Sequence, residues 1–138
     1  MKKLLFCLLV MPLTFALGEA SSGASSSANS KYKNLKEELT SFVADLEVKT
    51  YVLSIKSANT YKVESMSVRC LTGTAQVDLE INDVVVTGCN NTAVSSSTAT
   101  AVCTAANLLS KDQKLELKVD SEVSCVDFSL GLLMRRVS

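Results

Sequence analysis

The sequence predicts an all-β domain, an antiparallel β-sandwich or jelly roll of about seven or eight strands, preceded by one short amphipathic helix. The main observation is the alternation of apolar and polar residues at positions 75–82, 114–120 and 126–132. Such alternation is typical of an antiparallel sheet with one solvated face. Turn-forming runs such as Asn82-Asp83 and Ser95-Ser96-Ser97 separate the strands. A change of phase within residues 61–70 predicts a β-bulge near Ser65.

The first eighteen residues have the pattern of a cleavable signal peptide. Lys2 and Lys3 precede an apolar run, and Ala16-Leu17-Gly18 then places small residues where signal peptidase cleaves. The run of about fourteen residues is shorter than the roughly twenty that a membrane-spanning helix needs. We therefore expect a secreted or periplasmic protein that has no membrane contact after cleavage. An uncleaved membrane anchor is the alternative.

A leader and a helix are predicted between the signal peptide and the β-domain. Residues 19–32 are expected to be a flexible serine-rich leader, because positions 19–30 have no large apolar side chain. Residues 33–46 are expected to form the amphipathic helix, and residues 47–138 the β-sandwich domain. The apolar seam of this helix recurs at spacings of four, three and four residues and consists of Leu35, Leu39, Phe42 and Leu46. Two interpretations of the seam stay open: packing on the β-domain, or a short oligomerising coil.

Four cysteines remain after the signal peptide is removed, which favours two disulfides in an exported domain. A zinc site is disfavoured because the spacings of 19, 14 and 22 residues lack close cysteine pairs. A reversal at Ser96, midway between Cys89 and Cys103, sets these two opposite each other. Cys70 then pairs with Cys125, since both fall at the same end of an up-and-down sandwich. The alternative pairing is Cys70–Cys89 with Cys103–Cys125.

Composition excludes several functions. The chain has no histidine, so histidine-dependent nucleophiles and histidine-ligated metals are absent, and we expect neither a metal nor another cofactor. Asp78 and Glu80 share one face of one strand, but alternation places them on the solvated face, where nothing is expected to raise a pKa. We therefore expect no enzyme activity. Without Lys2 and Lys3 the chain has 12 basic and 14 acidic residues, which does not fit a nucleic-acid-binding surface.

Two further surface features are suggested by short patterns. Asn90-Asn91-Thr92 matches the N-glycosylation sequon, which makes Asn90 the candidate acceptor. Residues 92–104 consist mostly of Ser, Thr, Ala and Val, a composition that suits either a flat polar binding face or an ordinary exposed strand.

Several segments occur together in a recognisable order: residues 64–68 (ESMSV), 73–82 (GTAQVDLEIN), 86–88 (VTG), 99–101, 106–107, 115–120 (LELKVD) and 127–130 (DFSL). With them, the chain from Thr60 to Leu132 resembles a β-sandwich module of bacteriophage virion and tail-fibre proteins. The resemblance implies a structural, often trimeric protein and transfers no catalytic residue. The signal peptide and the four cysteines depart from that pattern and indicate an exported form. Residues 128–133 (FSLGLL) loosely resemble the last strand of the C1q-like jelly roll.

Three functions are consistent with these features. The first is a secreted, non-catalytic recognition or adhesion module that binds a glycan or another surface ligand. The second is a virion or tail-fibre structural protein, and the third is an exported small-ligand carrier or inhibitor. A homotrimer is the oligomer that the resemblance implies.

Overall fold

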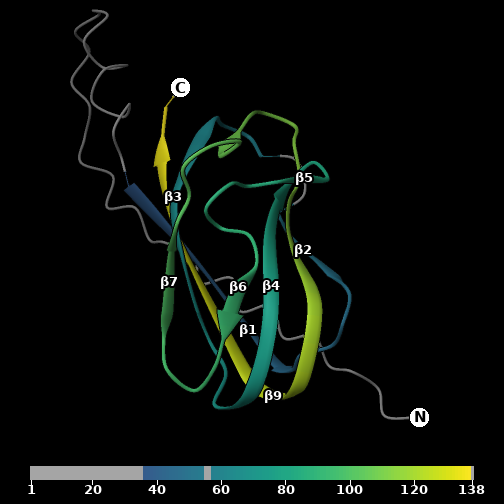
Figure 1. Cartoon of the computed structure of the whole chain (residues 1–138). Helices are drawn as coiled ribbons and strands as arrows, with labels where there is room; N and C mark the ends of the chain where they lie inside the picture. The colour runs from purple at the N-terminus through teal and green to yellow at the C-terminus, as the bar shows by residue number, and fades with distance from the viewer. Residues whose placement is uncertain (1–35, 55–56, 138) are drawn as a thin grey trace, which may run out of the picture.

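The computed structural model describes residues 36–54 and 57–137, and this part of the chain is all-β, as predicted. Its strands form one antiparallel sheet (Figure 1) and are β1 (Lys36–Asp45), β2 (Thr50–Ser54), β3 (Tyr61–Arg69), β4 (Thr72–Ile81), β5 (Val84–Val85), β6 (Thr92–Val94), β7 (Ala99–Val102), β8 (Leu108–Leu109) and β9 (Leu115–Arg136). Within the described ranges, no helix is long and apolar enough to cross a membrane. The predicted signal peptide, the leader and Leu35 lie outside them.

Strand β9, with 22 residues, is the centre of the sheet. Its first part lies between β2 and β4, and its second part lies between β1 and β3. β1 and β2 follow each other along β9 with a break at residues 46–49, and β3 and β4 do so with a break at residues 70–71. The short strands β5 and β6 extend the sheet beyond β4, while β7 and β8 extend it beyond β3.

The sheet curls because β9 bends near residues 122–127. Ser124 and Asp127 have positive φ angles of 51° and 52°, and the register with β4 shifts between Thr72 and Thr74. Gly73, at φ 80°, lies against this bend, where an added Cβ would be 2.1 Å from the carbonyl oxygen of Ser124. Only glycine fits there. Figure 1 shows β9 running down to the bend and back up toward the C-terminus.

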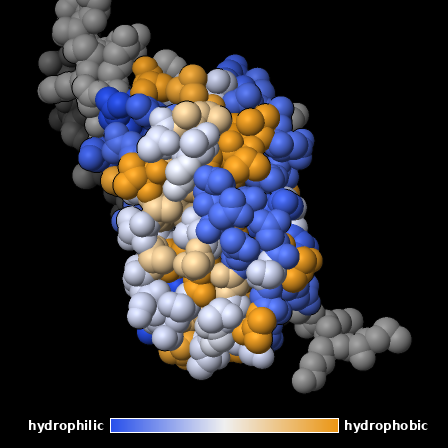
Figure 2. Space-filling view, in the orientation of Figure 1, coloured by the Kyte–Doolittle hydropathy of each residue, from blue (hydrophilic) through white to orange (hydrophobic). Residues whose placement is uncertain are grey.

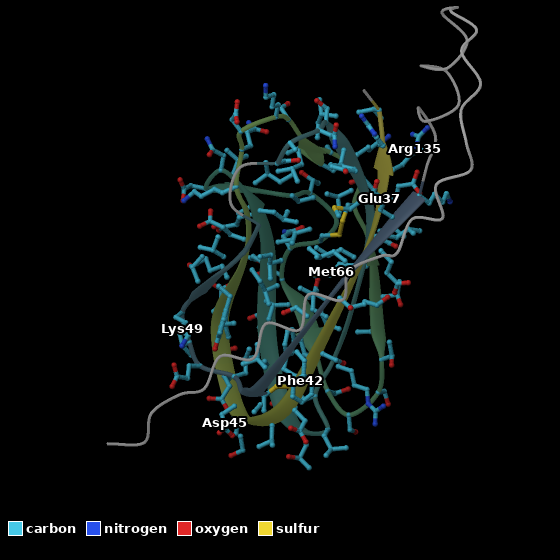
Figure 3. All side chains as sticks on the ribbon, turned by 180° about the vertical axis from the view of Figure 1, so that it is seen from behind. Glu37, Phe42, Asp45, Lys49, Met66 and Arg135 are labelled. Atoms are coloured by element: carbon cyan, nitrogen blue, oxygen red, sulfur yellow. A yellow bond between two sulfur atoms is a disulfide. The ribbon has the colours of Figure 1, made fainter. Side chains whose placement is uncertain are left out.

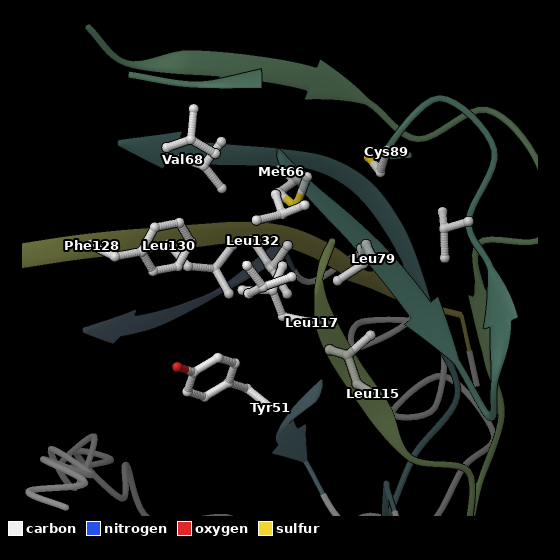
Figure 4. Packing of buried hydrophobic residues seen from close by; sticks show 14 of the residues in the cluster. Tyr51, Met66, Val68, Leu79, Cys89, Leu115, Leu117, Phe128, Leu130 and Leu132 are labelled. Carbon is white, nitrogen blue, oxygen red and sulfur yellow. The ribbon is translucent and has the colours of Figure 1, made fainter. Parts of the chain in front are cut away.

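The bend divides the sheet into two halves with one shared core. We call β2, β4 and residues 115–121 of β9 the first half, and β1, β3, β7 and residues 126–136 of β9 the second half. Side chains from both halves converge in this core (Figure 4), among them Leu79, Leu117, Met66, Phe128 and Leu132. Each of these five is at most 1% exposed, so both halves contribute fully buried side chains to the core.

The predicted helix is wrong for the described residues, because residues 36–45 form β1. Along β1, residues 37, 39, 41 and 43 are half-buried and the residues between them are exposed, which is the period of a strand. The seam is therefore split: Leu39 is half-buried and Leu46 is buried, whereas Phe42 is 61% exposed on the opposite face. Pairing with β9 determines the conformation, since tertiary contacts override helical spacing in so short a segment.

Other expectations are met in part. The predicted bulge near Ser65 is found at Glu64, where the β3–β9 register shifts between Val63 and Ser65. The turn at Asn82-Asp83 is present, with φ angles of 53° and 66°. The segments 114–120 and 126–132 were expected to be separate strands but belong to β9. The described strands form a single curled sheet rather than the two separate sheets of a predicted sandwich.

Candidate functional site

Two disulfides hold the curled sheet, and they are the two pairs that the sequence favoured. Cys70 and Cys125 are joined at the bend, with 5.5 Å between their Cα atoms. Cys89 and Cys103 are joined across the outermost strands, with a Cα separation of 5.1 Å. All four cysteines are buried. Two disulfides in so small a domain indicate an oxidising, extracellular type of environment.

The predicted hairpin around Ser96 is closed at its base and open in the middle. At its base, Thr87 and Ala105 form an antiparallel bridge, in the same register as the Cys89–Cys103 pair. Between the cysteines the two arms separate, because β6 pairs with β4 and β7 pairs with β3. The symmetry about Ser96 therefore identified the correct partners, although most of the hairpin does not pair with itself.

The outer face of the second half is flat and rich in small hydroxyl-bearing residues. One row crosses four strands, from Thr40 on β1 to Gly131 on β9, Ser67 on β3 and Thr100 on β7. Ser129, Ser65, Phe42, Leu133 and Val102 occupy the neighbouring rows of the same face. The same two rows also hold two charged residues, Glu38 opposite Leu133 and Arg69 opposite Ser129. We call the nine uncharged residues the flat face.

The flat face combines hydroxyl groups with exposed apolar side chains. The hydroxyls of Ser67 and Thr100 lie 3.2 Å apart. Phe42 and Val102 are 61% and 64% exposed, so neither is held by the core. At one end of the face, Glu64 bridges Lys36 at 3.3 Å and Arg135 at 3.0 Å. Strand β7 comes from the segment 92–104 that the sequence singled out, but β1, β3 and β9 contribute residues from three other parts of the chain.

The outer face of the first half is different, because it carries charged side chains that are largely buried. Glu80 and Glu116 lie directly opposite each other on β4 and β9, with Asp78 opposite Lys118 in the next pair. Asp78, Glu80 and Glu116 are only 7%, 9% and 4% exposed. Lys114 binds Glu116 Oε1 at 3.0 Å, whereas Oε2 is buried without a hydrogen-bond partner among the described residues.

The expectation that nothing raises a pKa at these carboxylates is wrong for Glu80. Burial is the largest cause and raises the pKa of Glu80 above its ordinary value, while the Lys118 ammonium opposes this change. The carboxylates of Asp78, Glu116 and Asp83 raise it further. The reason is geometric: alternation identified the outward direction correctly, but neighbouring side chains on adjacent strands cover these positions.

Two shallow hollows are found in the described part of the molecule. The first, about 260 Å³, lies between the ends of the two halves, with Leu39, Leu53, Leu109 and Met134 as its apolar walls and Tyr61 and Glu37 at its polar side. Burial, as the largest cause, raises the pKa of Tyr61. The second, about 270 Å³, lies beside β5 and Asn107. Both are open to solvent, and the interior between the halves is filled by side chains.

The remaining candidates from the sequence are the glycosylation acceptor Asn90 and the metal site that the sequence disfavours. The side chain of Asn90 lies on an exposed loop, where its Oδ1 accepts a hydrogen bond from the Gly88 N–H at 3.1 Å. Among residues 36–54 and 57–137, no group of three or more His, Cys, Asp or Glu side chains could hold a metal ion. The flat face was only partly foreseen, because register between distant strands is not visible in the sequence.

Comparisons with family models, curated sequences and solved structures do not show a family for this chain. No protein-family model matches the chain. No curated protein sequence matches it either. A solved structure titled "Cyanophage Pam1 capsid asymmetric unit" is similar to the chain with a TM-score of 0.41 and 13% identity, over 93% of this chain and 100% of the other.

Proposed function

We propose that the chain is an exported, non-catalytic recognition module that binds a surface ligand through the flat face, and that glycans are the ligand class. The observation that carries the proposal is the exposure of Phe42 and Val102 among hydroxyl-bearing residues on a flat face of four paired strands. Phe42 and Val102 stand on the two outer strands of the face, β1 and β7, with the hydroxyl-bearing residues of β9 and β3 between them, so a ligand that spans the face can contact both.

The chemistry of the flat face suits a sugar. Serine and threonine hydroxyls both donate and accept hydrogen bonds, which matches the hydroxyl groups of a glycan. An exposed phenylalanine ring and aliphatic side chains such as Val102 offer apolar contact to the C–H faces of sugar rings. The face is supported from behind by the core and by two disulfides, so that its geometry is fixed before a ligand arrives.

The experiment is binding of the secreted protein to a glycan array, with Val102→Arg as the test variant. We expect at least tenfold weaker binding for Val102→Arg, because the arginine side chain covers the face. Val84→Arg is the matched control: Val84 is a valine of similar exposure, 57%, on β5 and far from the flat face in the sheet order. Equal binding by the two variants, or no glycan bound by the parent protein, would contradict the proposal.

A structural subunit of a larger assembly, such as a virion-type protein, is the second candidate. The observation that favours it is the long outer edge of β1, which has no partner among the described residues. Such an edge is suited to pairing between chains. Isolation of the protein from its source in a large particle, or as a free small species, separates the two candidates.

A further inference from the structure

The sheet has two outer edges that differ in construction. One edge is built from β5, β6, β7 and β8, of two to four residues each, and the Cys89–Cys103 disulfide ties it together. The other edge begins with β1, ten residues that pair with β9 without a register shift. Among the described residues, no strand pairs with the outer side of β1. Figure 3 shows β1 crossing the back of the molecule between the labelled Glu37 and Asp45.

The backbone groups that β1 presents at this edge can be assigned. The N–H of Leu46 donates to the carbonyl oxygen of Cys125 at 3.1 Å, in the register that pairs Asp45 with Val126. In an antiparallel pair the direction of these groups alternates along the strand. The N–H and C=O groups of Leu39, Ser41 and Val43 are therefore directed away from β9, toward the open edge.

The edge lacks the features that usually prevent strands from pairing. Residues 39–44 (LTSFVA) carry no charge, proline or glycine. Natural edge strands are blunted by charges, prolines or bulges, and an edge without them is a template for another strand. Charges stand only at the two ends of β1, at residues 36–38 and at Asp45.

We propose that β1 pairs with β1 of a second copy of this chain, antiparallel and about a two-fold axis at Phe42. A parallel arrangement in register is excluded by charge, because each of Lys36, Glu37 and Glu38 would face its own copy. In the antiparallel arrangement, the inner and outer faces of the two sheets stay continuous, so residues of equal parity face each other.

Four antiparallel registers pair at least seven residues of β1, and side chains select one of them. Centring the axis on Leu39 brings Lys36 opposite Phe42 and keeps the charged residues 36–38 of both chains within the paired stretch. Centring the axis on Ser41 brings Glu37 opposite Asp45, and centring it on Thr40 brings Glu38 opposite Phe42. Centring it on Phe42 brings Phe42 opposite its own copy, Thr40 opposite Ala44 and Leu39 opposite Asp45. The paired stretch is then residues 39–45, and the charged residues 36–38 lie beyond it. A cross-strand aromatic pair is stabilising, and it covers a ring that is 61% exposed in the single chain.

The dimer has a consequence for the outer surface. Since the two sheets become one, the flat face of each copy continues into the flat face of the other, and two equal surfaces point in the same direction. This inference does not depend on the proposed glycan binding. A two-fold axis gives a dimer, so it also differs from the homotrimer that the sequence resemblance implies.

The first test is the mass of the secreted protein by sedimentation, for the parent and for Ser41→Pro and Ser41→Ala. Proline at position 41 removes an N–H that is directed to the open edge and leaves the hydrogen bonds to β9 in place. We expect a dimer for the parent and for Ser41→Ala, and a monomer with unchanged disulfides and circular dichroism for Ser41→Pro. A parent protein that is monomeric or trimeric at all concentrations, or a dimeric Ser41→Pro, overturns the proposal.

The second test needs no disruptive variant. Phe42→Cys places two thiols opposite each other across the axis, at a Cα separation of about 4.5–5.5 Å that a disulfide can bridge. After mild oxidation we expect a covalent dimer for Phe42→Cys and none for Thr40→Cys, whose copies lie far apart in this register. A covalent dimer that forms for Thr40→Cys and not for Phe42→Cys overturns the proposal. Glycan binding by monomeric Ser41→Pro is measured in a separate assay. The dimer proposal and the glycan-binding proposal can therefore fail independently of each other.

Discussion

The two halves of the curled sheet have equal inner faces and very different outer faces. Inside, both contribute fully buried aliphatic side chains such as Leu117 and Leu132. Outside, the first half carries carboxylates and lysines, while the second half carries small hydroxyl-bearing residues with Phe42 and Val102. Figure 2 shows part of this contrast on one side of the molecule: strongly hydrophilic colour follows β4 and the first part of β9, and paler colour covers β7. The alternation of apolar and polar residues is the same in both halves and gives them a shared core. The kind of polar residue differs between the halves, so their outer surfaces are unlike.

The largest expected effect comes from separating the halves at the bend. Replacing Cys70 and Cys125 by serine removes a cross-link between residues 55 positions apart, which should cost about 4 kcal/mol of unfolding free energy. Replacing Cys89 and Cys103 removes one between residues 14 positions apart and should cost about 3 kcal/mol. Urea denaturation of both double variants measures the difference. A greater loss for the Cys89–Cys103 pair would mean that the outer strands, rather than the bend, limit stability.

Matched cavities test whether the two inner faces are equivalent. Leu117→Ala in the first half and Leu132→Ala in the second half should each lower the free energy of unfolding by about 3 kcal/mol, because both side chains are at most 1% exposed. Thermal and chemical unfolding of the two variants provides the measurement. A loss below about 1 kcal/mol for one of them would show that its half is loosely packed.

The charged outer face of the first half should make stability depend on pH. The pKa of Glu80 is raised in the folded state, so folding favours its protonated form. The contribution of this group to the free energy of unfolding is therefore fully present below its ordinary pKa near 4.5. This contribution is lost as the pH rises through the folded pKa.

Glu80→Gln removes that dependence. The variant should be more stable than the parent by up to about 1 kcal/mol at pH 7, because the charge opposite Glu116 is gone. The advantage should vanish below the ordinary pKa. Melting temperatures of both proteins from pH 3 to 8 measure the difference between the curves, which cancels other titrating groups such as Asp120, whose pKa is lowered by Lys118. An advantage that grows as the pH falls would contradict this assignment.

The smallest effect is expected on the flat face. Thr100→Ala removes an exposed hydroxyl next to Ser67 and should change the free energy of unfolding by less than about 0.5 kcal/mol. Denaturation under the same conditions as for the buried variants gives the comparison. A loss above about 1.5 kcal/mol would show that this hydroxyl is needed for the fold rather than free for binding.

Local patterns in the sequence were sufficient for the strands and for the cysteine partners. Alternation located β4 and both parts of β9, and symmetry about Ser96 identified Cys89 and Cys103 as partners. These two predictions are correct because alternating burial along a strand and register about a turn depend on residues close together in sequence.

Long-range pairing could not be read in the same way. Residues 36–45 show apolar spacings that fit a helix, and only the presence of β9 alongside makes them a strand. The burial of the carboxylates and the composition of the flat face could not be predicted for the same reason. Each is assembled across strands more than thirty residues apart in sequence, such as Asp78 with Lys118 and Ser67 with Thr100.

The central place of β9 also determines when the molecule can fold. β9 is the last described strand, yet β1, β2, β3 and β4 all take their main hydrogen bonds from it. During synthesis the earlier strands therefore lack their common partner until residues 115–136 have emerged. Pairing between the first and last strands is non-local, which makes folding slow. If the chain is exported, as the proposed function requires, and crosses the membrane in the unfolded state, β1 to β4 would reach the far side first and would remain without their common partner until β9 follows.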